Sequence, residues 1–140
     1  MSSKTTIRVR YKETDQMGIV YYSNYFVWFE VARSECLRKL GNSYKELEKK
    51  GMFMPVIEAH CKYKSPAFYD DEIMIKTWAG EFTGVRITLY YEVYRKTDEK
   101  LLVEGFTVHA FTDDKGKPVT IKKTNPEIYR TIENYIAKSC

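Results

Sequence analysis

Residues 25–40 have the sequence YFVWFEVARSECLRKL, which predicts one long helix. Its first two turns are apolar on nearly every side, and this composition is typical of a helix buried in a protein core. The later turns carry a narrower apolar stripe with a spacing of about 3.6 residues. Ser23 or Asn24 can cap the start of the helix, and Gly41 can end it in a left-handed conformation. The stretch therefore predicts a core helix against which the other elements pack.

Strand patterns lie on both sides of this helix in the sequence. Residues 5–11 alternate between apolar and basic side chains, which is typical of a half-buried strand. A short second helix is predicted from a capping box formed by Ser43 and Glu46. The strands predicted after it span residues 54–63, 71–82, 85–95 and 101–112. A last helix is expected to begin with Asn125 as its N-cap and Pro126 in its first turn.

The order of these elements predicts the fold class. Consecutive strands joined by short turns pair antiparallel, so the long helix has one sheet to lie on. We therefore expect an α+β fold in which a curled antiparallel sheet wraps around one central helix. One strand alternates clearly, and its buried face is expected to consist of Ile87, Leu89, Tyr91 and Val93. Without repeats or a Pro/Gly/Ser-rich linker, residues 1–140 are expected to form a single domain.

The composition excludes several classes of protein. The chain is 44% hydrophobic and 30% charged, which excludes a disordered chain. Its 23 Lys and Arg against 19 Asp and Glu give a net charge of +4 with interspersed signs, so no nucleic-acid partner is expected. No apolar run approaches the roughly 20 residues of a membrane span, and the first residues lack an apolar signal core. We expect a cytoplasmic protein without integral membrane association.

The cysteines and histidines form no recognisable disulfide or metal pattern. Cys36, Cys61 and Cys140 are odd in number and lack CxxC spacing, so reduced thiols are expected. His60 and His109 are too few and too far apart to indicate a metal site, and His109 is expected to be a packed histidine. The sequence therefore predicts no metal and no separate cofactor.

The loop before the long helix carries the chemistry that indicates a function. Asp15 lies in it, Gly18 allows the backbone to turn, and the first N–H groups of the following helix have no partners inside that helix. These groups lie at the positive end of the helix dipole and could polarise a carbonyl oxygen. Asp15 could then attack the carbonyl carbon, or remove a proton from a water molecule that attacks it. The alternative interpretation is that Asp15 only caps a turn.

Residues 11–25, with the sequence YKETDQMGIVYYSNY, and the following Glu30 and Arg33 resemble the signature of the hotdog-fold acyl-CoA thioesterases. The resemblance is greatest to the 4-hydroxybenzoyl-CoA thioesterase type and to the acyl-CoA thioesterases of the Tol-Pal cluster. It covers about residues 7–112 and includes the order of the elements. It implies a hotdog fold, an acyl-CoA substrate of which coenzyme A is a part, and a homodimer or homotetramer with sites at the subunit interface.

The resemblance also implies roles for individual residues. Asp15 corresponds to the catalytic aspartate of the family, and Tyr22 supplies the backbone N–H that polarises the thioester carbonyl. Many relatives of the Tol-Pal type have histidine at the position of Tyr22, whereas the 4-hydroxybenzoyl-CoA enzymes have tyrosine. A backbone donor survives that exchange. Tyr11, Gly18 and Tyr25 are expected to contribute to substrate binding.

Three functional hypotheses follow from the sequence. The first is an acyl-CoA thioesterase that acts on a short-chain or aromatic acyl group. The second is a hotdog dehydratase or hydratase, which usually needs a histidine near the start of the helix. The third is a non-catalytic module that binds acyl-CoA.

Other polar residues have ordinary structural interpretations. Glu30 is predicted on the buried half of the long helix, in an ion pair with Arg33. Tyr90 and Tyr94 are predicted on the outer face of the sheet, as an oligomer contact or a plain sheet surface. Three basic residues are candidates either for holding the CoA phosphates or for a solvated face: Lys62, Lys64 and Arg86.

Overall fold

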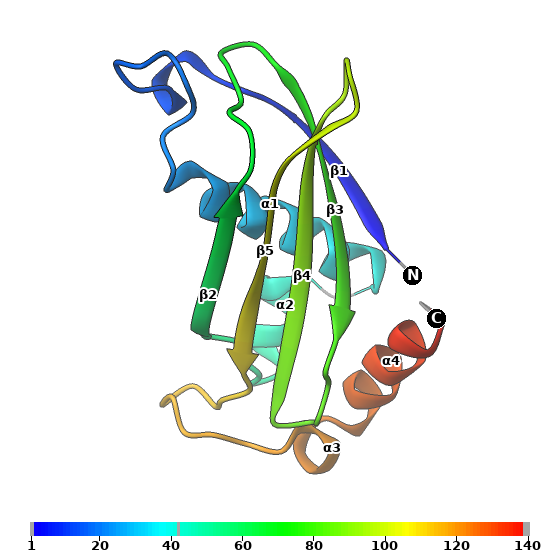
Figure 1. Ribbon diagram of the computed structural model, residues 1–140. Helices are drawn as coiled ribbons and strands as arrows, with labels where there is room; N and C mark the ends of the chain where they lie inside the picture. The colour runs from blue at the N-terminus through cyan, green and yellow to red at the C-terminus, as the bar shows by residue number, and fades with distance from the viewer. Residues whose placement is uncertain (1, 42, 139–140) are drawn as a thin grey trace.

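The predicted core helix lies across one face of an antiparallel sheet in the computed structural model, which describes residues 2–41 and 43–138 (Figure 1). The elements are β1 (Ser3–Arg8), the 3-10 helix η1 (Tyr11–Glu13), α1 (Asn24–Lys39), α2 (Tyr44–Lys49), β2 (Val56–Tyr63), β3 (Glu72–Gly80), β4 (Arg86–Arg95), β5 (Lys100–Ala110), α3 (Ile121–Thr124) and α4 (Pro126–Ala137). The strand order is β1-β3-β4-β5-β2, and all neighbouring strands are antiparallel. The predicted architecture of one sheet around one helix is therefore confirmed.

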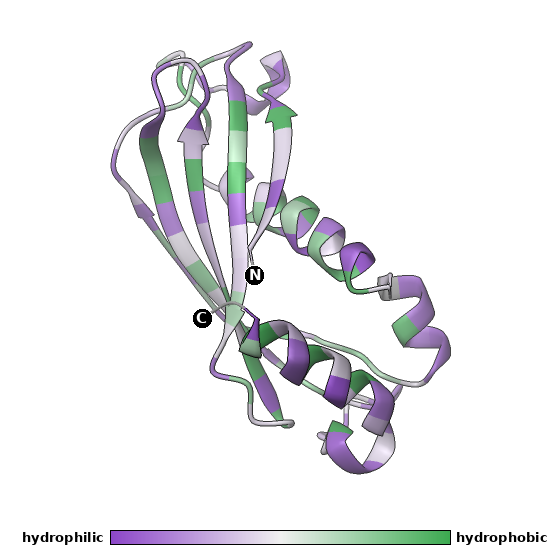
Figure 2. Ribbon diagram, turned by 90° about the vertical axis from the view of Figure 1, so that its right-hand side faces the viewer, coloured by the Kyte–Doolittle hydropathy of each residue, from purple (hydrophilic) through white to green (hydrophobic). Residues whose placement is uncertain are grey.

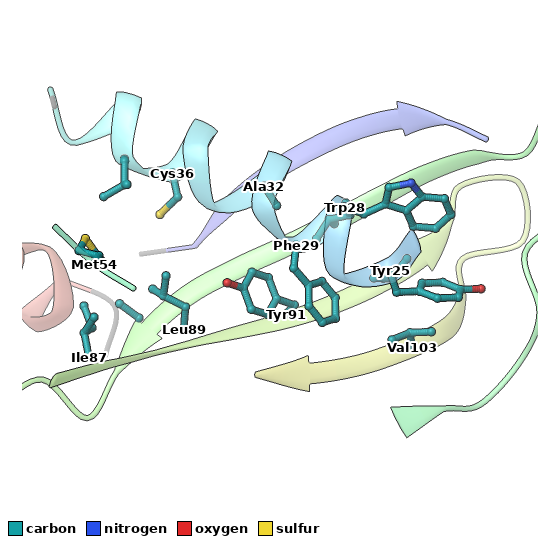
Figure 3. Packing of buried hydrophobic residues seen from close by; sticks show 14 of the residues in the cluster. Tyr25, Trp28, Phe29, Ala32, Cys36, Met54, Ile87, Leu89, Tyr91 and Val103 are labelled. Carbon is teal, nitrogen blue, oxygen red and sulfur yellow. The ribbon is translucent and has the colours of Figure 1, made fainter. Parts of the chain in front are cut away.

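Both long helices lie on the same side of the sheet, as Figure 2 shows for α1 and α4. The core fills the space between these helices and the sheet. The inner face of β4 consists of the predicted residues Ile87, Leu89, Tyr91 and Val93, all of which are buried. The side chains of α1 that face them include Phe29, Ala32 and Cys36 (Figure 3). Phe29 stacks on Tyr91 with 4.2 Å between the ring centroids, so the middle of α1 is fixed directly on the sheet.

Helix ends follow the predicted capping in part. Ser43 accepts a hydrogen bond from the Glu46 N–H at 3.2 Å, and Gly41 has a φ of 90° after α1, as expected. The start of α1 differs from the prediction, because the Ser23 side chain makes no capping hydrogen bond. Asn24 instead donates its side-chain amide to the carbonyl of Glu13 at 2.9 Å. This bond ties the helix to the preceding loop.

The expectation that the first turns of α1 are buried on every side is wrong. Val27 and Val31 are 49% and 39% exposed. Glu30 is exposed as well, so it does not lie on the buried half of the helix. One sheet covers one face of a helix, and the opposite face of α1 therefore points outward.

The first strand is shorter than predicted. β1 ends at Arg8, and Tyr11 begins η1 and is 77% exposed. Its assignment to a half-buried strand is therefore wrong. The sequence pattern also does not predict the short helix α3, which has only four residues. Short helices with one or two turns lack the length at which a periodic pattern becomes visible.

A chain of buried polar side chains crosses the core. Arg33 donates to the Tyr91 hydroxyl at 3.1 Å, and that hydroxyl lies 2.7 Å from the Thr107 hydroxyl. The Thr107 hydroxyl lies 2.8 Å from His109 Nε2, and His109 Nδ1 lies 3.0 Å from the Met54 carbonyl oxygen. Burial lowers the pKa of His109 to about 4, so the ring is neutral at pH 7. The prediction of a packed histidine is confirmed.

Gly105 in β5 allows an unusually close approach of backbone and ring. A Cβ atom at this position would lie 2.4 Å from the backbone oxygen of His60 and 2.9 Å from the ring of Phe29. Contacts this short do not occur between unstrained atoms. The packing of α1 against β5 therefore requires glycine here.

Candidate active site

The loop between η1 and α1 is folded by backbone hydrogen bonds. The Asp15 N–H donates to the Ile19 carbonyl, and the Gly18 N–H donates to the Asp15 carbonyl, each at 2.9 Å. Gly18 has a φ of 79°, which glycine adopts without strain. Oδ1 of Asp15 accepts the Met17 N–H at 2.9 Å, so this oxygen does cap a turn. Oδ2 of Asp15 accepts no hydrogen bond from the described residues and is free for another role.

Asp15 borders a cavity of about 420 Å³ at the start of α1. Apolar and aromatic side chains form most of its wall, among them Tyr22, Tyr25 and Tyr63. Lys64 also borders the cavity, from the segment that follows β2. The cavity thus combines a carboxylate, a wall of apolar and aromatic side chains and one cation, and its size is that of a small-molecule site.

The turn just before α1 provides an unpaired backbone donor beside this cavity. The Tyr22 N–H donates to no acceptor in the described part of the chain. Its neighbours are anchored, because the Tyr21 N–H donates to the Glu13 carbonyl at 2.8 Å and the Asn24 N–H donates to the Tyr21 carbonyl at 3.0 Å. The Tyr22 carbonyl accepts the hydroxyl of Tyr63 at 3.1 Å. An unpaired N–H group at a helix start can bind and polarise a carbonyl oxygen.

Three of the tyrosines that border the cavity have raised pKa values. Burial raises the pKa of Tyr25 to about 12, and burial also raises the pKa of Tyr63. The neighbouring Tyr22 raises the pKa of Tyr21. The rings of Tyr22 and Tyr25 approach the ring of Tyr63 edge-on, with centroid distances of 6.4 and 5.4 Å. The part of the wall formed by these rings is therefore aromatic, which suits an apolar or aromatic group.

The structure brings three of the five predicted site residues together. Asp15, Tyr22 and Tyr25 border the same cavity. Gly18 forms the turn between Asp15 and α1 without bordering the cavity. Tyr11 lies apart from them on η1, where its ring packs edge-on against Tyr69 at 5.5 Å.

Two residues that the sequence analysis did not single out support the site. Glu13 is buried and accepts the indole N–H of Trp28 at 2.8 Å, and Tyr63 binds the Tyr22 carbonyl. A buried indole needs a hydrogen-bond acceptor, and this need is the one sequence signal that points toward a residue such as Glu13. Tyr63 gives no such signal, because its contact joins residues 41 positions apart.

The three candidate phosphate-binding residues lie in different places. Lys64 borders the cavity and pairs with Glu104 at 3.4 Å. Lys62 borders a separate hollow of about 280 Å³ on the outer face of the sheet, together with Tyr90. Arg86 lies at the start of β4 and does not border the cavity. Lys64 is therefore the one of the three that is placed to meet a ligand in the cavity.

Metal-binding clusters, free thiols and membrane-spanning helices are further features that bear on function. Within residues 2–41 and 43–138, no three His, Cys, Asp or Glu side chains are grouped so that they could hold a metal ion. Cys36 and Cys61 are free thiols, and Cys140 lies outside the described residues. No helix in the described part of the chain is long and apolar enough to cross a membrane. The cytoplasmic location stays a prediction.

Proteins of similar sequence are found among known thioesterases. A family model described as the thioesterase-like superfamily matches residues 9–130. The putative acyl-CoA thioesterase YneP of Bacillus subtilis (strain 168) is 37% identical over 132 residues, which are 94% of this chain and 95% of that protein. The match thus includes the loop, the core helix and the whole sheet after β1.

Solved structures give the same relationship at the level of the fold. A DHNA-CoA thioesterase from Staphylococcus aureus has a TM-score of 0.93 and 34% identity, over 99% of this chain and 93% of that chain. A gentisyl-coenzyme A thioesterase has a TM-score of 0.79 and 26% identity, over 86% of this chain and 97% of that chain.

Proposed function

This chain belongs to the thioesterase-like superfamily and has the hotdog fold, and we propose that it hydrolyses the thioester bond of a short-chain or aromatic acyl-CoA. Its relatives include proteins named as acyl-CoA thioesterases. One observation carries the proposal: the free carboxylate oxygen of Asp15 and the unpaired N–H of Tyr22 belong to residues that border one cavity. These two groups supply what thioester hydrolysis needs, a base or nucleophile and a donor for the carbonyl oxygen.

In the proposed mechanism, the thioester carbonyl oxygen accepts a hydrogen bond from the Tyr22 N–H. This bond strengthens as negative charge develops on the oxygen in the transition state. Asp15 removes a proton from a water molecule while the water oxygen bonds to the carbonyl carbon. The carbon–sulfur bond then breaks, the CoA thiolate takes up a proton, and the acid and free CoA leave. In the alternative route the Asp15 carboxylate itself attacks the carbonyl carbon, the carbon–sulfur bond breaks to release the CoA thiolate, and water hydrolyses the resulting anhydride to the acid and free Asp15.

The wall of the cavity supports an aromatic or short acyl group. Tyr22, Tyr25 and Tyr63 border the cavity, and aromatic rings pack favourably on one another. Two structural relatives are thioesterases for DHNA-CoA and gentisyl-coenzyme A, whose acyl groups are aromatic. We propose the same class of acyl group for this chain.

The positions of the histidines favour hydrolysis over dehydration. His60 is exposed and borders the hollow on the outer face, whereas His109 is buried in the core. Neither residue borders the cavity with Asp15. A hotdog dehydratase would need a histidine beside its carboxylate, and a thioesterase that uses the Tyr22 backbone does not.

We further propose that the chain, as one domain, forms a homodimer through β2, alone or as half of a homotetramer. β2 is an edge strand paired only with β5, and seven of its eight residues are exposed. The Lys64 N–H donates to the Leu102 carbonyl and therefore points toward β5. Backbone N–H groups alternate in direction along a strand of an antiparallel pair, so those of Ala59 and Cys61 point away from β5, to the unpaired edge. An open edge of this length is a template for a second strand.

Release of free thiol from a panel of acyl-CoAs tests the proposed activity. The panel runs from acetyl- to palmitoyl-CoA and includes hydroxybenzoyl-, phenylacetyl- and dihydroxynaphthoyl-CoA. We expect the highest turnover with aromatic or short acyl groups. Acyl-CoA binding without thiol release would instead indicate a binding module, and interconversion of 3-hydroxyacyl and enoyl thioesters would indicate a dehydratase.

Isotope labelling separates the two roles open to Asp15. A single turnover in ¹⁸O-labelled water, with enzyme in excess, is followed by mass spectrometry of the peptide that contains Asp15. Label in the carboxylate side chain indicates the anhydride route. Label in the acid product alone, together with no covalent acyl-enzyme trapped at Asp15, indicates that Asp15 acts as a general base.

A further inference from the structure

Glu13 carries a buried carboxylate that the proposed reaction does not use. The residue is only 4% exposed. Its Oε1 accepts the Arg10 N–H at 2.8 Å and lies 3.5 Å from the Arg10 Nε, while Oε2 accepts the Trp28 indole N–H at 2.8 Å. Both oxygens therefore act as acceptors. Glutamine could not replace this pair, because an amide has one acceptor oxygen.

The backbone of Glu13 holds the residues on either side of Tyr22. Its carbonyl oxygen accepts the Tyr21 N–H at 2.8 Å and the Asn24 side-chain amide at 2.9 Å. The Tyr22 N–H thus lies between two residues that are bonded to one oxygen atom. The first turn of α1 is oriented by this carbonyl as well as by its own helical bonds.

The short segment from Glu13 to Asp15 has little freedom to absorb a change. Thr14 forms an isolated antiparallel bridge with Val20. Its N–H and its hydroxyl both donate to the Tyr11 carbonyl, at 3.1 and 2.7 Å. A displacement of Glu13 would therefore be transmitted to Asp15 along the chain.

We infer that Glu13 is a positioning residue that sets the placement of the Asp15 carboxylate relative to the Tyr22 N–H; this inference rests on the proposed function. Its side chain joins η1 to α1 through Trp28, and its carbonyl joins the first turn of α1 to η1. Both groups that act on the thioester carbonyl are thus placed from one residue. Because a displacement of about 1 Å can cost about 100-fold in rate, Glu13 acts on kcat more than on binding.

Glu13→Gln tests the inference with a side chain of the same size. One acceptor oxygen becomes an NH₂ group that faces a donor, so the contact is lost while the volume is kept. With the acyl-CoA that the wild type hydrolyses fastest, we expect kcat to fall about 100-fold and KM to change less than about threefold. Glu48→Gln is the matched control on the exposed surface of α2 and should keep wild-type kcat. Wild-type kcat in Glu13→Gln, measured per folded molecule, would overturn the inference.

Trp28→Phe tests whether Glu13 acts through the indole contact. It removes the N–H donor and keeps an aromatic ring in the core. In the double variant the amide of the introduced glutamine no longer faces that donor, so kcat should be no lower than in Glu13→Gln alone. Losses that multiply would mean that the two residues act separately, and this result would also overturn the inference.

A measurement without substrate distinguishes this inference from the proposed function. In a Trp78→Phe background the fluorescence reports Trp28, and we expect Glu13→Gln to shift its emission maximum and to speed hydrogen exchange at the Tyr21 N–H. An unchanged spectrum and unchanged exchange count against the inference. A wild type that releases no thiol from any acyl-CoA refutes the proposed function, whereas an active wild type with an equally active Glu13→Gln variant refutes only the role of Glu13.

Discussion

Strands β3 and β2 are similar in length but differ in what surrounds them. β3 has nine residues, is paired on both sides with β1 and β4, and alternates regularly between buried and partly exposed side chains. β2 has eight residues, is paired only with β5, and exposes seven of its side chains. Both edges of β3 are thus paired with strands of the same chain. β2 has one unpaired edge, and its last residue, Tyr63, borders the cavity. We call the region of β2 and the cavity with Asp15 the open side of the molecule, and the core around the inner strands the closed side. The backbone groups of β2 and the Asp15 carboxylate oxygen that have no partner in the described part of the chain lie on the open side, where substrate and a second copy are proposed to bind.

The largest expected effect lies on this open side, at Asp15. Asp15→Asn keeps the shape of the side chain and removes the charge that accepts a proton, so we expect kcat for thiol release to fall by about 10²–10⁴-fold. The free energy of unfolding, measured with denaturant, should change little. Asp114→Asn replaces an exposed carboxylate after β5 and should keep wild-type turnover. Undiminished hydrolysis by Asp15→Asn would show that Asp15 is neither the base nor the nucleophile of the reaction.

The next effect concerns the open edge of β2. Ala59→Pro removes a backbone N–H that is directed away from β5, so the sheet inside one chain stays intact while pairing with a second copy is blocked. Losing two such hydrogen bonds across a symmetric interface costs about 3 kcal/mol, and we expect the dimer dissociation constant to rise about 100-fold.

Sedimentation measures this change in the dissociation constant. Ala59→Thr keeps the N–H group and serves as the control with wild-type association. A proline variant that associates like the wild type would mean that β2 is not the interface.

In the core, the expected effect concerns His109, which should make the free energy of unfolding depend on pH. The folded pKa of His109 is about 4, below the ordinary value of 6.5, because the ring is buried. The native state therefore binds fewer protons than the unfolded state, and stability falls as the pH decreases from about 6.5 to about 4. The total loss amounts to about 3 kcal/mol.

Urea unfolding at constant ionic strength between pH 7 and pH 4 measures this loss. His109→Gln should remove this part of the pH dependence, while His60→Gln, on the outer face, should retain it. An identical slope in His109→Gln and the wild type would contradict the assignment to the buried histidine.

The smallest effect is expected for Tyr22→Phe. The proposed mechanism uses only the backbone N–H of this residue, and the residue is 58% exposed. The kcat for thiol release should therefore stay within about twofold of the wild type. A tenfold loss would assign a role to the hydroxyl and would move part of the chemistry from the main chain to the side chain.

The sequence predicts the core between α1 and the sheet well, because apolar periodicity reflects contacts made within the chain. The stripe of Phe29, Ala32 and Cys36 on α1 and the alternation of Ile87 and Leu89 on β4 are both confirmed as core. The same pattern fails for Val27 and Val31, which are exposed. An apolar side chain indicates that it needs a partner, but it does not indicate that the partner belongs to the same chain.

The candidate site divides in a similar way. Asp15 and the start of the helix are predicted as one site because they are close in sequence, and the family resemblance assigns the backbone donor to Tyr22. Both residues do border one cavity. Glu13 and Tyr63 are not predicted, because their contacts with Trp28 and Tyr22 join residues 15 and 41 positions apart. Such contacts arise only when the chain has folded, and no local pattern records them.

The close packing at Gly105 has a consequence for which mutations the protein can tolerate. Any side chain there would push against Phe29, one turn after Tyr25, and would lift the first turns of α1 away from the sheet. In a library that contains every single substitution, position 105 should therefore be among the most depleted, although it lies on the sheet and not at the cavity. The distance between α1 and the sheet, and with it the geometry at Asp15, therefore depends on the absence of a side chain at position 105.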